Sequence, residues 1–176
     1  MEMEILKKKS SAGFTLTELL VAMFAFGMII VSIGGVSQSI IKAQRKAFAL
    51  QEVQESGRYL LEAMSKEIRM STINTGGIGV TNTDTLNITN TKSQTVVYYF
   101  NGVNNRMEKQ INGGVWEDIS PANLNLTGSF YIRKDSVPAP RALITINMKI
   151  ESSGLRVEQA ANIYLQSSIS SRSWNY

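Results

Sequence analysis

The feature that most constrains this chain is an uncharged run of 23 residues, LLVAMFAFGMIIVSIGGVSQSII, between Glu18 and Lys42. An α-helix rises about 1.5 Å per residue, so this run would reach roughly 35 Å and could cross a hydrocarbon layer of about 30 Å. A cluster of lysines, Lys7, Lys8 and Lys9, precedes the run, and no comparable cluster follows it closely. Because basic residues stay on the cytoplasmic side, we expect the N-terminus inside and the rest of the chain outside.

Two ordinary kinds of segment share this pattern. A single-pass anchor would keep the apolar run, whereas a secretory signal peptide would be removed at a small-residue site such as residues 37–39. The carboxylate of Glu18 argues against both, because an unpaired acid costs on the order of 2.5–3.5 kcal/mol at the membrane centre and less near the interface. Glu18 therefore needs a cation as its partner.

The residues on either side of Glu18 form a motif. KKKSSAG ends at Gly13, and FTLTELLVA begins at Phe14 and leads directly into the apolar run. This resembles the class III signal of bacterial type IV prepilins and type II secretion pseudopilins. The resemblance implies that a prepilin peptidase cuts between Gly13 and Phe14 and that Phe14 is N-methylated. It also implies that Glu18 pairs with the terminal amine of a neighbouring subunit during assembly.

The same resemblance implies partners and a location. The partners would be the prepilin peptidase, other pilin or pseudopilin subunits and an inner-membrane assembly platform. The chain would first span the cytoplasmic (inner) membrane once, N-in and C-out, and then enter a pilus or pseudopilus outside the cytoplasm. A minor subunit is favoured, because residues 161–172 resemble the closing strand of minor pilins. The helix-bending proline and the C-terminal cysteines common in major pilins are also absent.

Beyond Lys42 the chain changes from apolar all round to amphipathic. We predict one helix over residues 14–70, which no proline interrupts, and we expect its second half to pack on a C-terminal sheet. The predicted apolar stripe contains Ala43, Ala47, Leu50, Val53, Gly57, Leu60, Leu61, Met64 and Ile68.

From Ser71 onward, short β-branched and aromatic runs alternate with turn residues. The predicted strands are residues 85–89, 95–100, 106–111, 115–119, 129–133, 143–151 and 155–168. The expected fold class is α+β, a pilin-like long helix on a C-terminal antiparallel β-sheet domain. The predicted parts are a leader (1–13), a transmembrane and assembly half of the helix (14–41), an amphipathic half (42–70) and a β-rich domain (71–176).

Composition removes most catalytic chemistry. The chain has no Cys and no His, which excludes thiol nucleophiles, Cys/His zinc sites and Ser-His-Asp arrangements. We expect no catalytic residue, no metal and no cofactor. The acids of the C-terminal domain show no calcium-loop spacing, and only two of them are adjacent. These acids are Asp84, Glu108, Glu117, Asp118, Asp135, Glu151 and Glu158.

The prediction is a non-enzymatic structural subunit of a type IV pilus or type II secretion pseudopilus. The alternative is a secreted or membrane-anchored β-domain that binds a ligand, including a DNA-binding subunit of a competence pilus. The basic residues of the C-terminal domain are scattered along the chain, which argues against nucleic acid as a partner. An enzyme that uses only carboxylates would need two acids facing each other across a cleft.

Overall fold

The computed structural model describes residues 13–135, 141–153 and 160–171. Lys7, Lys8 and Lys9 lie outside these residues. The chain divides into two compact units, one ending at Ile41 and the other beginning at Lys42. The first unit is helical beyond its first few described residues, and the second contains all the strands. Each unit is described by itself below.

One helix, α1 (Leu16–Arg69), contributes to both units, and it agrees with the predicted helix within two residues at each end. Its buried positions in the second unit are Ala49, Val53, Gly57, Leu60, Met64 and Ile68. Three residues assigned to the stripe, Ala43, Ala47 and Leu50, are exposed instead. The buried face begins only at Ala49, so Ala43 and Ala47 precede it, and Leu50 lies about 100° round the helix from Ala49.

The strands form two antiparallel sheets where one was expected. The first sheet has the order β1-β3-β4-β5-β6 and the second the order β2-β7-β8-β9. Their bounds are β1 Thr72–Ile73, β2 Gly79–Thr83, β3 Thr85–Thr89, β4 Thr95–Asn101, β5 Arg106–Ile111, β6 Glu117–Asp118, β7 Leu124–Asp135, β8 Arg141–Ser152 and β9 Asn162–Ser170. The α+β fold class, one long helix on antiparallel sheets, is confirmed.

Several strand predictions need correction. Strands β1 and β2 were missed because both are short edge strands in a stretch rich in Thr, Asn and Gly, which sequence patterns score as turns. The predicted strand at residues 129–133 is part of the twelve-residue β7, and that at 115–119 shrinks to the two residues of β6. The last strand begins at Asn162, and residues 155–159 of its predicted start lie outside the described part of the chain.

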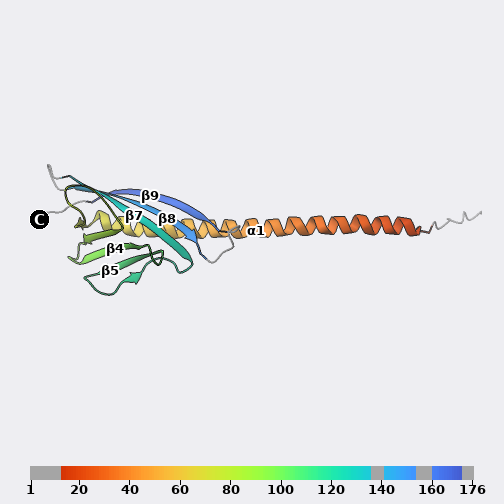
Figure 1. Cartoon of the computed structure of the whole chain (residues 1–176), viewed down its shortest axis with the longest axis horizontal. Helices are drawn as coiled ribbons and strands as arrows, with labels where there is room; N and C mark the ends of the chain where they lie inside the picture. The colour runs from red at the N-terminus through yellow and green to blue at the C-terminus, as the bar shows by residue number, and fades with distance from the viewer. Residues whose placement is uncertain (1–12, 136–140, 154–159, 172–176) are drawn as a thin grey trace, which may run out of the picture. The chain divides into compact units, whose positions relative to one another are not determined.

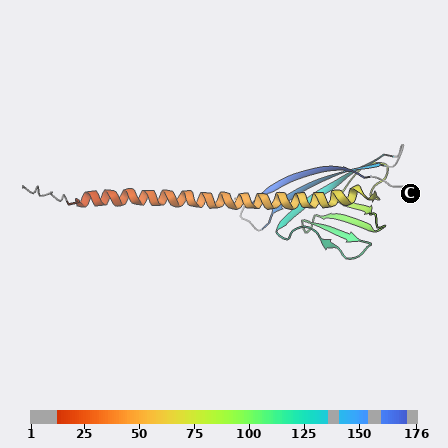
Figure 2. The same cartoon turned by 180° about the vertical axis from the view of Figure 1, so that it is seen from behind.

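The core lies where α1 meets both sheets. In Figures 1 and 2, β7, β8 and β9 lie on one side of the second half of α1, and β4 and β5 lie on the other. Alternate residues of β8, from Ala142 to Ile150, are buried, as the period-2 pattern predicts. The two sheets also touch each other, since the rings of Phe100 and Phe130 lie 4.9 Å apart. A main-chain bond from Leu126 N–H to the carbonyl oxygen of Asn105 reinforces this contact at 2.8 Å.

Glu67 ties α1 to the first sheet. Its Oε2 accepts a hydrogen bond from the Tyr98 hydroxyl and another from Lys109 Nζ at 2.8 Å. Burial opposes the charged form of Glu67, but hydrogen bonds from Lys109 and Tyr98 outweigh it, and the pKa of Glu67 falls below its ordinary 4.5. Burial and the same carboxylate raise the pKa of Tyr98. The three side chains therefore form one polar link between the helix and the sheet.

We expect this link to make stability depend on pH. Because the folded pKa of Glu67 is lowered, its contribution is present above pH 4.5 and is lost as the pH falls through the folded value. Glu67→Gln should lower the free energy of unfolding by about 1 kcal/mol at pH 7; the loss is small because the site is partly exposed to solvent. The free energy of unfolding of this variant should also fall less steeply as the pH drops. Urea unfolding from pH 3 to 7 measures this. Glu62→Gln, which removes an exposed acid, is the control. If the free energy of unfolding depends on pH in the same way for Glu67→Gln and wild type, Glu67 is not the group responsible.

Candidate processing and assembly site

The predicted cleavage point lies just before α1 and is open to solvent. Gly13 and Phe14 have no regular secondary structure, and Phe14 is 81% exposed. A side chain placed on Gly13 would meet no other atom within 4 Å. The main chain of Gly13 and Phe14 is therefore not part of the helix.

Thr15 caps the start of α1. Its hydroxyl accepts a hydrogen bond from the main-chain N–H of Glu18 at 3.3 Å, and its carbonyl oxygen accepts bonds from the N–H groups of Glu18 and Leu19. Thr15 is therefore the N-cap and Glu18 the third helical residue, the spacing of a capping box. Sequence reasoning missed this role of Thr15, although the Thr-x-x-Glu pattern carries the signal.

Glu18 is placed by that cap in the first turn of α1, where its negative charge complements the helix dipole. Its side chain is exposed, and within the residues that the structure describes its carboxylate has no hydrogen bond or ion pair. The cap uses only the main-chain N–H of Glu18. The carboxylate thus remains available to a cation from outside the described chain.

The helical part that follows Glu18 is suited to an apolar environment. It is long and apolar enough to cross a membrane, and none of that window is buried within the protein. Two of its serines bond to the preceding turn: Ser32 Oγ donates to the carbonyl oxygen of Met28 at 2.8 Å and Ser39 Oγ to that of Gly35 at 3.2 Å. Such bonds to the preceding turn let a hydroxyl enter lipid or a packed interface.

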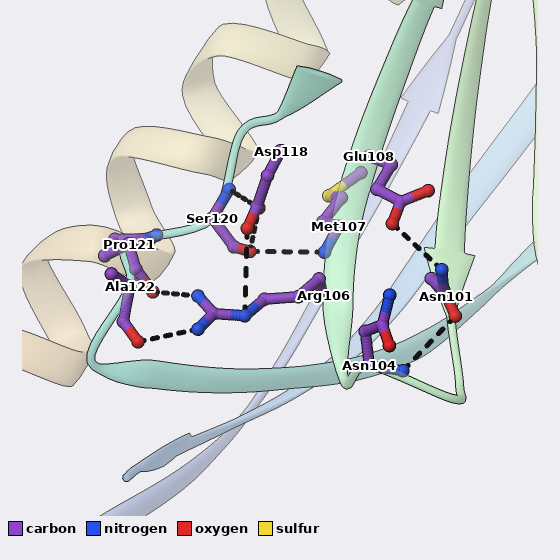
Figure 3. Close-up of polar contacts among 9 residues, drawn as sticks. All are labelled: Asn101, Asn104, Arg106, Met107, Glu108, Asp118, Ser120, Pro121 and Ala122. Carbon is purple, nitrogen blue, oxygen red and sulfur yellow. Dashed lines mark hydrogen bonds and ion pairs between the residues drawn. The ribbon is translucent and has the colours of Figure 1, made fainter. Parts of the chain in front are cut away.

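The second unit brings together two acids that the sequence did not pair. Glu108 on β5 lies opposite Asp118 on β6 in the register. Each is engaged separately: Glu108 accepts a bond from the Asn101 amide at 2.9 Å, and Asp118 accepts one from the main-chain N–H of Ser120 at 2.8 Å (Figure 3). These bonds hold turns in place. Adjacent Glu117 and Asp118 are both exposed.

Arg106 completes this cluster as a clamp on the segment before β7. Its guanidinium donates to the carbonyl oxygens of Pro121 and Ala122 at 2.7 and 2.6 Å and lies 3.7 Å from Asp118 (Figure 3). The charged groups of Arg106 and Asp118 therefore bond mainly to main-chain groups of residues 120–122. In residues 13–135, 141–153 and 160–171, no three Asp or Glu side chains gather as metal ligands would.

Comparison with known proteins identifies the N-terminal segment. Residues 8–34 match the family model described as the prokaryotic N-terminal methylation motif. No curated protein and no solved structure matches the chain. The match covers Gly13, Phe14, Glu18 and the beginning of the apolar half of α1, and one long helix packed on antiparallel sheets is consistent with the pilin fold. The matched segment indicates a prepilin-like N-terminus, the kind found in type IV pilins and pseudopilins.

Proposed function

We propose that this chain is a minor, non-enzymatic subunit of a type IV pilus or type II secretion pseudopilus. The observation that carries the proposal is the methylation motif at residues 8–34. It is in register with the exposed Phe14 and with Glu18 at the start of α1, whose carboxylate has no partner among the described residues. The partners are a prepilin peptidase, other pilin or pseudopilin subunits and the inner-membrane assembly platform.

In this proposal the parts of the chain act in sequence. Residues 1–13 are a cytoplasmic leader that the peptidase removes, and residues 14–41 anchor the protein in the inner membrane, N-in and C-out. Residues 42–70 and the β-rich domain, residues 71–176, lie outside the cytoplasm. Because cleavage falls before the apolar helix, the product keeps that helix, which serves first as an anchor and then as the filament core.

Charge pairing would set the register of assembly. Cleavage at Gly13 creates a terminal amine on Phe14, and methylation leaves that amine positively charged. Glu18 of a neighbouring subunit would then supply the matching carboxylate. Away from water, breaking such a pair costs about 3–5 kcal/mol, because one charge is left uncompensated. Subunits whose axial position pairs the two charges are therefore favoured over subunits displaced along the filament axis.

Intact mass and N-terminal sequencing test the processing step. Protein from membranes that contain the peptidase should begin at methylated Phe14, whereas membranes without it should hold the 176-residue precursor. Gly13→Val should also accumulate as precursor, because a branched side chain would occupy the predicted cleavage point. Gly27→Ala, at a helical glycine with no neighbour within 4 Å, is the control and should be processed normally.

Another start point would overturn this proposal. A mature chain that begins near residue 40 would have lost the apolar segment, and the protein would be an exported β-domain instead. Normal processing of Gly13→Val would contradict the assigned bond.

A further inference from the structure

Among the described residues, the outer edge of β9 is a long strand edge that no other strand covers. β9 ends the order β2-β7-β8-β9, and none of the described strands pairs with its other side. Its nine residues, Asn162–Ser170, include no charge and no proline, and its register with β8 runs without a bulge. Proteins normally block such edges with charges, prolines, bulges or short strands, because an open edge accepts another chain.

The hydrogen bonds show which residues face this open edge. Ser171 N–H donates to the carbonyl oxygen of Ala142, and Ser152 N–H donates to that of Ala161, both at 2.9 Å. The odd-numbered residues that flank β9, Ala161 and Ser171, therefore direct these main-chain groups toward the β8 side. Since the direction alternates along an antiparallel strand, the even-numbered residues present theirs to the open edge. These residues are Asn162, Tyr164, Gln166, Ser168 and Ser170.

A groove between β9 and α1 continues this edge; we call it the β9 groove. Ser167 lines it from β9, and Leu61 and Met70 supply apolar surface from α1 and the residue after it. Its charged lining is Arg58, Glu62, Lys66 and Arg69. None of these four side chains has a hydrogen bond or ion pair within the described residues, so three cations face one acid.

We propose that β9 and its groove bind an extended, acidic segment of another protein, which joins the second sheet as a fifth strand. Main-chain bonds to the even-numbered residues of β9 would provide affinity. Alternate apolar side chains of the segment would enter the groove over Leu61 and Met70. Its carboxylates would neutralise Arg58, Lys66 and Arg69, which gives the site a preference for acidic partners.

A second copy of this chain fits the edge less well. Two β9 strands that pair antiparallel around a two-fold axis would reverse residues 42–69 of α1 in one copy. Copies anchored in one membrane by their N-terminal segments share one orientation. This step rests on the proposed membrane anchoring, while the open edge and the charged groove do not.

Binding of a synthetic peptide to the full chain in detergent micelles tests the proposal. The probe is a fluorescent nine-residue peptide that alternates isoleucine or valine with threonine and carries two glutamates. Fluorescence anisotropy should give a dissociation constant on the order of tens of micromolar. The same peptide with N-methylated amides at alternate positions should bind at least about tenfold more weakly, because it cannot complete the ladder.

Gln166→Pro is the informative variant. Proline removes the N–H that Gln166 directs to the open edge and leaves the ladder between β8 and β9 intact, as edge prolines do. It should weaken peptide binding at least about tenfold, while Gln166→Thr, which keeps the donor, should bind like wild type. Circular dichroism verifies that both variants fold. Lys66→Glu should weaken binding of the acidic peptide and strengthen binding of a matched peptide with lysines.

Three outcomes would overturn the proposal. They are no binding of the acidic peptide up to about 1 mM, equal binding by the N-methylated peptide, and equal binding by Gln166→Pro. Self-association of the wild-type chain that Gln166→Pro abolishes would assign the edge to a second copy instead. These measurements do not depend on cleavage or methylation, so a failure here is distinguishable from a failure of the proposed function.

Discussion

Replacing Glu18 by glutamine or leucine should abolish incorporation into filaments while membrane insertion and cleavage continue. The carboxylate of Glu18, which has no partner within residues 13–135, 141–153 and 160–171, is the group proposed to meet a neighbour's terminal amine. Loss of one partner from such a buried pair costs about 3–5 kcal/mol, which corresponds to at least about a hundredfold less incorporation. Quantitative immunoblots of sheared filaments and of membranes measure the two pools.

Glutamine separates the two roles that Glu18 has at the start of α1. At the third helical position glutamine can still act in a capping box, so it removes the charge and keeps the helix start. Glu55→Gln neutralises an exposed acid in the second half of α1 and is the matched control. Normal incorporation of Glu18→Gln would show that charge pairing does not drive assembly.

Gly128→Ala should destabilise the second unit more than any other single methyl addition proposed here. A Cβ at this position of β7 would lie 2.4 Å from the carbonyl oxygen of Asn147 on β8 and 2.7 Å from the Phe100 ring. The first contact is main chain, so it can be relieved only by spreading β7 from β8. The second lies where the two sheets touch. We expect a loss of about 3 kcal/mol in the free energy of unfolding.

Urea unfolding followed by circular dichroism measures this loss. Gly102→Ala is the control, because a Cβ there would meet nothing within 4 Å, and its effect should stay within about 0.5 kcal/mol. Equal stabilities of Gly128→Ala and Gly102→Ala would mean that the sheets separate at little cost. The packing at Phe100 and Phe130 would then contribute less than the geometry indicates.

The helix and the N-terminal motif could be predicted from the sequence because the residues that determine them are close together in the chain. Apolar length, the absence of proline and the Gly13–Phe14–Glu18 spacing all lie within one continuous stretch. The alternation of β8 was equally clear, since every second residue from Ala142 to Ile150 faces the core. Ala47 and Leu50, which the sequence pattern assigned to the buried stripe but which are exposed, show where such a pattern fails. An apolar residue marks a candidate position, but contact with the sheets decides which helix face is buried.

The sequence alone determined the prepilin-like start, the apolar helix and the α+β class, because each depends on neighbours within a few helical turns or strand residues. Only the tertiary structure decided that the strands form two sheets and that β9 is left as an open edge beside Arg58, Lys66 and Arg69. It also brought Glu67 to Tyr98 and Lys109, which lie 31 and 42 residues away in sequence. Pairings across such separations depend on how whole elements pack, and no local pattern records them.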